Sequence, residues 1–410
     1  MVMRGISDLD STTRQLLLAR AVRSVGQGAL VVDLALYLRA LQWSGASIGL
    51  VLSAAGLLGA GLSLMVGVIS DRSRRKPFLL GYEGIVLLAS VGTLLSTQPI
   101  ILGAAIVIGG FGRGANGAAG PFSPAEQAWL AEKLLPKRRG RVYSLNAALG
   151  FFGMGLGALI AILPSFWGGW LAGAAAYRPL FAVTGLAAIV NLLLLAQARE
   201  THSGPVLDSS PQGLQREAQI RKEENRVLAK VLAINSLNGL AVGLTGPLIA
   251  YWFALRFDVG PAEIAPVMAA TFLLSGVSSL VTGRLSERIG LVQSVVRARL
   301  IGLVLLVLLP IMPTYWAASM AYLLRSVFNR GSSGARQALT IGLVRDERRG
   351  LAISLNAVSR QVPRSIGPTL AGLLMDAGLF GVPFYAAAVL QGFYLLAYRR
   401  VFRKYEPPTE

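Results

Sequence analysis

Charged side chains inside long apolar stretches are the residues of this chain best suited to do chemistry. The acids in these stretches are Asp33 and Glu83, and arginines outnumber them. A charge within hydrocarbon is tolerated only when it faces water or a counter-ion. A guanidinium binds carboxylate or phosphate through two parallel hydrogen bonds, so a surplus of arginine favours an anionic ligand. The deep arginines are Arg113, Arg325, Arg330, Arg360 and Arg364.

Helical spacing relates some of these arginines to one another. Arg360 and Arg364 are four residues apart and therefore share one face of a helix, whereas Arg325 and Arg330 need not. Three further arginines lie near the ends of apolar stretches, where a long side chain extends to the membrane surface. These three are Arg20, Arg23 and Arg336.

Polar side chains in the same stretches could complete a binding site. They are Gln27, Asn116, Asn146, Asn235, Asn238, Asn329, Asn356 and Gln361. Asn146 and Asn356 occupy matching positions of an internal repeat. For each residue taken alone, the alternative is a hydrogen bond that joins two neighbouring helices.

Other kinds of chemistry find no support in the residue types. The chain has no cysteine and a single histidine, His202, which excludes the usual zinc and copper ligand sets. The apolar stretches contain no acid–base pair and no nucleophile arrangement, and the sequence has no GxxxxGK[ST] phosphate-binding loop. We therefore expect no metal, no cofactor, no enzymatic activity and no direct use of ATP.

The composition identifies the elements that must position these side chains. Of the 410 residues, 54% are hydrophobic and 14% are charged, against roughly 25% charged in soluble proteins. A membrane-spanning helix needs ~20 mostly apolar residues. The sequence predicts an all-α integral membrane protein with twelve transmembrane helices. Their windows are 16–38, 47–69, 77–97, 99–120, 142–163, 179–198, 229–255, 262–283, 294–312, 315–340, 351–375 and 383–402.

The distribution of basic residues predicts the orientation. The 39 Lys and Arg residues exceed the acids by 19. Most lie in alternate loops and in the tails, while the opposite loops hold only Arg39, Arg178 and Arg256. The positive-inside rule then places both termini in the cytoplasm and the chain in the cytoplasmic membrane. This rule also explains the net charge without a nucleic-acid partner.

An internal repeat divides the chain into two halves. Residues 138–147 read RRGRVYSLNA, and residues 348–357 read RRGLAISLNA. A polar segment, residues 199–226, lies between two sets of six windows. We therefore predict a six-helix bundle over 1–198, a cytoplasmic linker over 199–226 with a short helix near residues 214–222, and a second six-helix bundle over 227–410. Such duplicated halves surround a central site in many transporters.

The loop after the second window carries a family signature. It resembles the G-x-x-x-D-R-x-G-R-K motif of the major facilitator superfamily, with Arg74 in place of the second glycine. The agreeing residues are Gly67, Asp71, Arg72, Arg75 and Lys76, and a weaker copy contains Gly283, Glu287 and Arg288. In that family the element ties the two halves together in the outward-open state. The alternative is a plain positive-inside loop.

A second element resembles the same family. Arg113-Gly-Ala-Asn116-Gly-Ala-Ala is similar to its R-x-x-Q-G-x-A pattern. In proton-coupled members this arginine acts with a nearby carboxylate, which here would be Asp33; the alternative is a fixed ion pair. The fifth window lacks the Gly-Pro pair common in antiporters of the superfamily, although Gly367-Pro368 occurs in the eleventh.

Topology, duplication and motifs together predict a secondary transporter of the major facilitator fold. We expect proton-coupled export or exchange of a small organic anion or amphiphile by alternating access, with protons as the coupling ion and the membrane lipids as surroundings. We expect a monomer. The alternatives are a broad drug/proton antiporter and a lipid-headgroup transporter. A membrane enzyme is the alternative of a different class.

Overall fold

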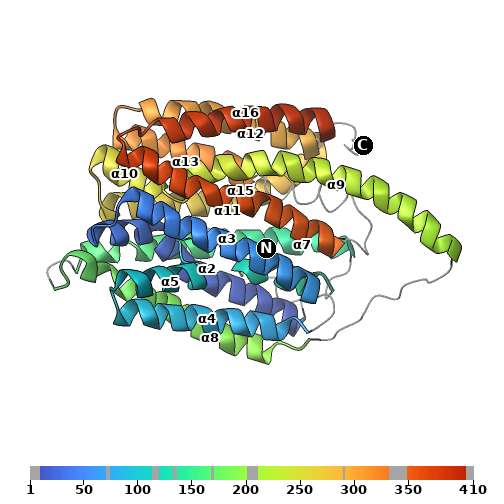
Figure 1. Ribbon diagram of the computed structural model, residues 1–410, viewed down its shortest axis with the longest axis horizontal. Coiled ribbons are helices and arrows are strands. Elements are labelled where there is room, and N and C mark those ends of the chain that lie inside the picture. Colours follow the sequence, from blue (N-terminus) through green and yellow to red (C-terminus); the bar gives the residue numbers. More distant parts are fainter. Residues whose placement is uncertain are drawn as a thin grey trace.

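The computed structural model describes residues 10–70, 74–112, 120–132, 136–167, 170–200, 211–289, 291–331 and 349–402. Every regular element in these ranges is a helix. The helices run roughly side by side in one elongated bundle, with residues 11–197 in its lower part and residues 211–402 in its upper part (Figure 1).

The first half begins at a capped helix. The carboxylate of Asp10 accepts a hydrogen bond from the backbone N–H of Thr13 at 3.3 Å, which satisfies one free donor of the first turn. Proline also occupies the first turn of several later helices, including those that start at residues 76, 99 and 179, where no intrahelical donor is lost. The helices are α2 (Ser11–Ala40), α3 (Gly45–Ser70), α4 (Lys76–Leu95), α5 (Pro99–Gly109), α6 (Ser123–Glu132), α7 (Pro136–Ile160) and α8 (Pro179–Gln197). Short 3-10 turns are η1 (Gly120–Phe122), η2 (Leu163–Ser165) and η3 (Gly173–Tyr177).

The second half starts with a long helix that extends beyond the bundle (Figure 1). The predicted short linker helix is wrong in extent, because residues 214–222 are the start of α9 and continue directly into its apolar part. The helices are α9 (Pro211–Thr245), α10 (Ile249–Phe257), α11 (Pro261–Ile289), α12 (Leu291–Leu308), α13 (Tyr315–Gly331), α15 (Arg349–Asp376) and α16 (Val382–Phe402), with the 3-10 turn η4 (Leu309–Ile311). A Gly-Pro pair at 246–247 separates α9 from α10.

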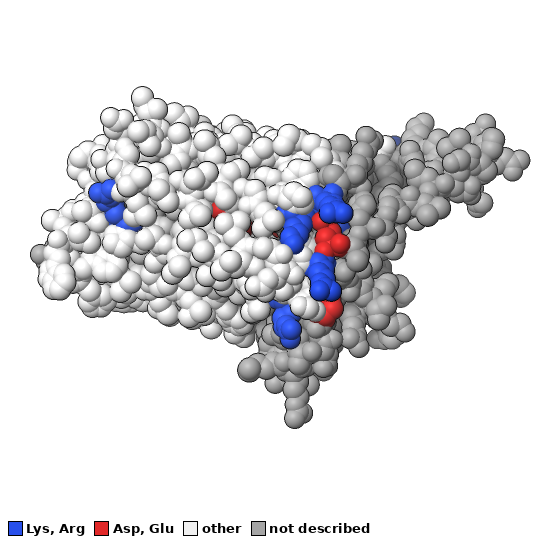
Figure 2. Space-filling model, turned by 90° about the horizontal axis from the view of Figure 1, so that it is seen from below, with Lys and Arg blue, Asp and Glu red and all other residues white. Residues whose placement is uncertain are grey.

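Length and apolarity fit a membrane protein. Seven helical segments of the described chain are long and apolar enough to cross a bilayer, and each of the twelve predicted windows contains a helix. Many large apolar side chains lie on the outside, as lipid contact requires. Figure 2 shows one face on which most of the described surface is uncharged, with charged side chains gathered mainly toward one end and a basic group near the other.

Glycines allow the corresponding pair of helices to pack closely in each half. In the first half, a Cβ at Gly28 or Gly157 would collide with the backbone of the partner helix, so α2 and α7 pack backbone to backbone. In the second half, Gly239 and Gly367 play the same part between α9 and α15. Gly157 and Gly367 are 210 residues apart, as are Asn146 and Asn356. The packing therefore follows the repeat that the sequence shows.

Candidate functional site

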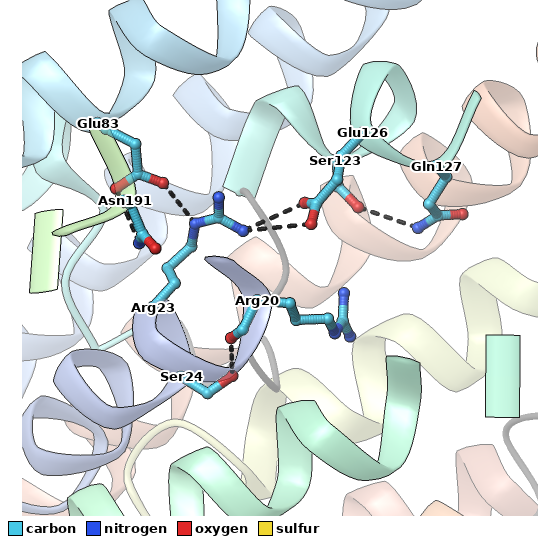
Figure 3. A network of polar contacts seen from close by, with 8 residues as sticks. All are labelled: Arg20, Arg23, Ser24, Glu83, Ser123, Glu126, Gln127 and Asn191. Atoms are coloured by element: carbon cyan, nitrogen blue, oxygen red, sulfur yellow. Dashed lines mark hydrogen bonds and ion pairs between the residues drawn. The ribbon is translucent and has the colours of Figure 1, made fainter. Parts of the chain in front are cut away.

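A network of buried charges occupies the first half. Arg23 of α2 donates from Nε to Glu83 Oε1 of α4 at 2.6 Å, and from Nη1 to Glu126 Oε2 of α6 at 3.2 Å. Asn191 Nδ2 of α8 donates to the other oxygen of Glu83 at 3.3 Å. Figure 3 shows Arg23 between the two carboxylates. Arg20 lies one turn away and interacts electrostatically with Glu126. We call Arg20, Arg23, Glu83 and Glu126 the N-half charge network.

This network corrects two sequence predictions. Arg20 and Arg23 do not extend to the membrane surface, because each is only 5% exposed. A buried arginine needs compensation by an opposite charge, which Arg23 finds in Glu83 and Glu126. The sequence reasoning missed Glu126, since it lies outside the apolar windows. The signal that could have found it is the apolar face formed by Ala125, Trp129 and Leu130 around it.

A small cavity of about 20 Å³ adjoins the network. Its polar lining comes from Arg23, Gln27, Tyr82, Glu83, Thr184 and Asn191. A polar cavity of this size has room for one water molecule. Gln27, which was predicted as a substrate-site residue, therefore lies beside the N-half charge network.

Asp33 lies farther along α2 than this network. Ten residues separate it from Arg23, about 15 Å along the axis at ~1.5 Å per residue. Its side chain is 1% exposed, and neither carboxylate oxygen accepts a hydrogen bond from a described residue. Its predicted partner Arg113, together with Asn116, lies outside the described residues.

Two arginines of α13 lie inside the second half: Arg325 is buried and Arg330 is half-buried. Arg330 donates to the Tyr322 hydroxyl at 3.3 Å, and its guanidinium lies 4.6 Å from the centre of the Phe272 ring. Arg325 donates to Thr245 Oγ1 at 3.4 Å. Arg364 of α15 lies within electrostatic reach of Arg330. Neither α13 arginine pairs with a carboxylate in the described part of the chain. We call Arg325, Arg330 and Arg364 the C-half arginine cluster.

The environment of Arg360 differs from that of the C-half arginine cluster. Its side chain is exposed, and its Nε donates to the backbone carbonyl of Asn356 on its own helix at 3.1 Å. Arg364, one turn farther on, is half-buried. The shared helix face therefore does not give the two arginines the same surroundings.

Arg299 is a buried arginine that the sequence analysis did not single out. It lies within α12 and is only 4% exposed. It donates to Asn238 Oδ1 of α9 and lies 4.9 Å from the ring centre of Tyr394 of α16. The spacing of 216 residues that relates Gly67 to Gly283 also relates Glu83 to Arg299. The two halves thus place opposite charges at matching positions.

The predicted asparagines differ in their roles. Asn356 Oδ1 of α15 accepts a hydrogen bond from Asn235 Nδ2 of α9 at 2.7 Å, which joins two helices of one half. Asn146 is buried on α7, and the side chain of Asn329 lies against Gly302 of α12. The contacts of Asn235, Asn238 and Asn356 thus match the structural alternative, a hydrogen bond that joins two neighbouring helices.

The predicted loop lock is described only in part. Asp71 and Arg72 lie outside the described residues, and only the helical backbone is described at Gly67, Gly283, Glu287 and Arg288. The backbone N–H groups of Arg75 and Lys76 donate to the Glu200 carboxylate at 2.6 and 3.1 Å. Glu200 therefore caps the positive end of the α4 dipole, and this contact joins α4 to the residues that follow α8 rather than to the second half.

The two halves meet closely at the end that carries the predicted outer loops, called the outer end here. The Asp376 carboxylate at the end of α15 accepts the backbone N–H groups of Gly45 and Ala46 at the start of α3, both at 2.8 Å. One turn farther on, Gly49 packs against the backbone of Pro368. Deeper still, Thr369 Oγ1 and Ser53 Oγ are 2.7 Å apart. The α3–α15 contact therefore closes the halves together from the outer end inward.

Replacing Asp376 by Asn is expected to loosen this outer contact several-fold without unfolding either half. The amide keeps one acceptor oxygen but loses the charge that the first turn of α3 favours. Spin labels at Thr97→Cys and Leu379→Cys would report the separation of the halves, since the chain has no other cysteine. An unchanged distance distribution in the Asn variant would show that Asp376 does not contribute to closure.

Comparison with known proteins identifies a matching family and two relatives. The family model of the Major Facilitator Superfamily matches residues 16–229 and 231–410. The uncharacterized membrane protein YJR124C of Saccharomyces cerevisiae is 21% identical over 300 residues, which cover 63% of this chain and 64% of that protein. The uncharacterized MFS-type transporter YwoD of Bacillus subtilis is 26% identical over 171 residues, 40% of this chain and 36% of that protein. The matches thus span less than two thirds of either relative.

Solved structures agree in fold over almost the whole chain. A bacterial homologue of the human lysosomal transporter Spinster, in an inward-facing and occupied conformation, superposes with a TM-score of 0.70 at 17% identity, covering 97% of this chain and 98% of the other. The nucleoside transporter NupG gives 0.69 at 13% identity, with 95% and 100% covered. The D-xylose–proton symporter gives 0.69 at 14% identity, with 97% and 98% covered. The predicted all-α membrane fold and the prediction of a transporter rather than an enzyme are confirmed, and the chain belongs to the major facilitator superfamily.

Proposed function

We propose that this transporter moves a small organic anion or anionic amphiphile across the cytoplasmic membrane by proton-coupled export or exchange, as a monomer with both termini in the cytoplasm. The observation that carries the proposal is the C-half arginine cluster. Arg325 and Arg330 bring two positive charges among helices α9, α11 and α13, with no described carboxylate paired to either.

The partners of these arginines support a ligand role. A hydroxyl and an aromatic ring stabilise a guanidinium only in part, since neither carries a negative charge. A charged group held in a span costs free energy unless it meets water or an anion. A carboxylate or sulfonate of a substrate would supply that charge through two parallel hydrogen bonds. The N-half charge network offers no such surplus, because two acids accompany its two arginines.

The closed outer contact supports alternating access as the way of working. Asp376 and Gly49 lie in the contact of α3 with α15, which joins the two halves. Helices α7 and α11 make a second contact between the halves, where Phe152 lies against Gly276. A substrate site between the halves would face the cytoplasm in this state. Opening the outer contact would turn it toward the other side.

Asp33 is the residue that we propose to carry the coupling proton. A carboxylate buried without a hydrogen-bond donor is costly in its charged form and much less so when protonated. Opening of the surrounding helices to water would reverse that preference and release the proton. This behaviour differs from that of a fixed ion pair, which would keep the carboxylate charged in every state.

Replacing Asp33 by Asn is expected to abolish accumulation of substrate that is driven by a pH gradient, while exchange of substrate across a membrane without a gradient continues. Asn occupies the same volume but exchanges no proton. Proteoliposomes loaded with carboxyfluorescein, with a pH gradient imposed or omitted, would measure both modes. Asp258→Asn, in the exposed turn before α11, is the matched control and should behave like the wild-type protein.

If the Asp33→Asn variant accumulates carboxyfluorescein as well as the wild type does, Asp33 is a structural residue. If a cationic rhodamine is accumulated in place of carboxyfluorescein, the protein is a drug/proton antiporter. If fluorescent phospholipids change leaflet instead, it moves lipid headgroups.

A further inference from the structure

Helix α6 occupies a special place between the two halves. It contacts α2, α3 and α4 of its own half, and it also contacts α15 of the other half. Most of the remaining contact between the halves runs through α3, α7, α11 and α15. Any rocking of one half against the other must therefore change the surroundings of α6. Glu126 is the charged residue that α6 contributes to the N-half charge network.

The two carboxylates of this network are held unequally. Glu83 accepts the Nε of Arg23 at 2.6 Å and is also bound by Asn191, so α2, α4 and α8 fix it together. Among the described residues, only Nη1 of the same arginine donates to the carboxylate of Glu126, at 3.2 and 3.4 Å to its two oxygens. Longer hydrogen bonds to a shared donor are weaker. Figure 3 shows Glu126 approaching Arg23 from the side opposite Glu83.

A polar cavity of about 20 Å³, with room for one water molecule, borders Arg23 and Glu83 of the network, whereas Glu126 is not among its lining residues. The titratable groups near Glu126 are Arg20 and Arg23 on α2, Tyr82 and Glu83 on α4, and Tyr143 on α7. Helix α15, which also contacts α6, carries Arg360 and Arg364 among its described side chains. Helix α3 carries no titratable side chain.

From this asymmetry we infer that Glu126 is a second proton-exchange site, whose ion pair with Arg23 holds α6 in place when the outer contact is closed. The inference rests on the proposed proton-coupled transport. It adds Glu126 as a second residue that takes up and releases a proton. This role differs from the one proposed for Asp33, because Glu126 acts through its ion pair with Arg23, which links α6 to α2.

The step is a simple proton transfer. Water on the cytoplasmic side gives one proton to a carboxylate oxygen of Glu126, which becomes a neutral acid. The attraction between Arg23 and Glu126 is lost, while Arg23 keeps Glu83 as its counter-ion. Helix α6 is then free to move against α2 and to change its contact with α15. Loss of the proton restores the ion pair and the original position.

The test uses the conformation of the whole protein and requires no substrate. Spin labels at Thr97→Cys and Leu379→Cys report the outer separation of the halves in proteoliposomes from acid to alkaline pH. The wild-type background should shift between two distance populations with pH. In Glu126→Gln this shift should be lost, and the distribution should stay at the one that the wild type adopts in acid. In Glu126→Asp the shift should persist with a displaced midpoint, because the shorter acid still titrates.

Glu263→Gln is the matched control, since the Glu263 carboxylate accepts the backbone N–H of Gly260, in the turn before its own helix at the outer end. A pH response in Glu126→Gln equal to that of the wild type overturns the inference, as does the absence of any response in the wild type. Failure of the proposed function would look different: carboxyfluorescein would not be transported, although the pH response remained and depended on Glu126.

Discussion

Replacing Arg330 by Gln is expected to weaken the binding of an anionic substrate more than tenfold. The half-buried guanidinium lies between Tyr322 and Phe272 and would lose its charge-assisted contact with the anion. Truncating one partner of such a pair typically costs about 2–5 kcal/mol, and each 1.4 kcal/mol corresponds to roughly a factor of ten in affinity. Binding of carboxyfluorescein and of a cationic rhodamine, followed by fluorescence anisotropy, would compare two ligands of similar size and opposite charge.

The matched control is Arg360→Gln, because Arg360 is exposed and bonds to its own helix backbone. It should leave the affinity for carboxyfluorescein within about twofold of the wild type. Equal losses in both variants would mean that only general surface charge attracts the anion. A loss of thermal stability in Arg330→Gln with unchanged selectivity would make the C-half arginine cluster a structural element.

Replacing Gly49 by Leu is expected to abolish transport by preventing closure of the outer contact. A Cβ at this position would already collide with the backbone of Pro368 and Thr369, so a larger side chain requires α3 and α15 to separate. Neither half has to unfold, because the clash lies between them. The spin-label pair at residues 97 and 379 should then show only the wider separation, and carboxyfluorescein accumulation should fall to the level of empty liposomes.

Gly61→Leu on the same helix is the control. A Cβ at Gly61 meets no atom within 4 Å, and the residue is exposed. This variant carries the same change of helix propensity and apolarity without the clash. It should close and transport normally. Normal transport by Gly49→Leu would contradict the view that the α3–α15 contact must close during turnover.

The sequence predicted the fold well because long apolar windows and basic loops are local signals. Helices occupy all twelve windows, and the repeat that relates Asn146 to Asn356 reappears in the glycine packing of α2 with α7 and of α9 with α15. The sequence also identified Arg325 and Arg330, since a charge inside an apolar run is visible without knowledge of its partners.

Partners across helices were harder to predict, because pairing depends on how the helices are rotated and how deep each residue lies. From its place near the end of an apolar stretch, Arg23 was predicted to extend to the membrane surface. In the structure, ion pairs with Glu83 and Glu126 hold it in the interior. Glu126 itself follows a Gly- and Pro-rich stretch that shows no helical periodicity. The buried Arg299 was not singled out in the sequence, because several basic residues of a loop precede it closely. Asp376 could not be recognised as a cap for α3, because 331 residues separate it from Gly45.

The charge preference of transport tests the central claim most directly. Proteoliposomes containing the wild-type protein would be offered carboxyfluorescein and a cationic rhodamine together under an imposed pH gradient. The C-half arginine cluster predicts that the anionic dye alone is accumulated, and that Arg325→Gln and Arg330→Gln each reduce this accumulation more than tenfold. Accumulation of the cationic dye, equal in the wild type and in both variants, would contradict the account.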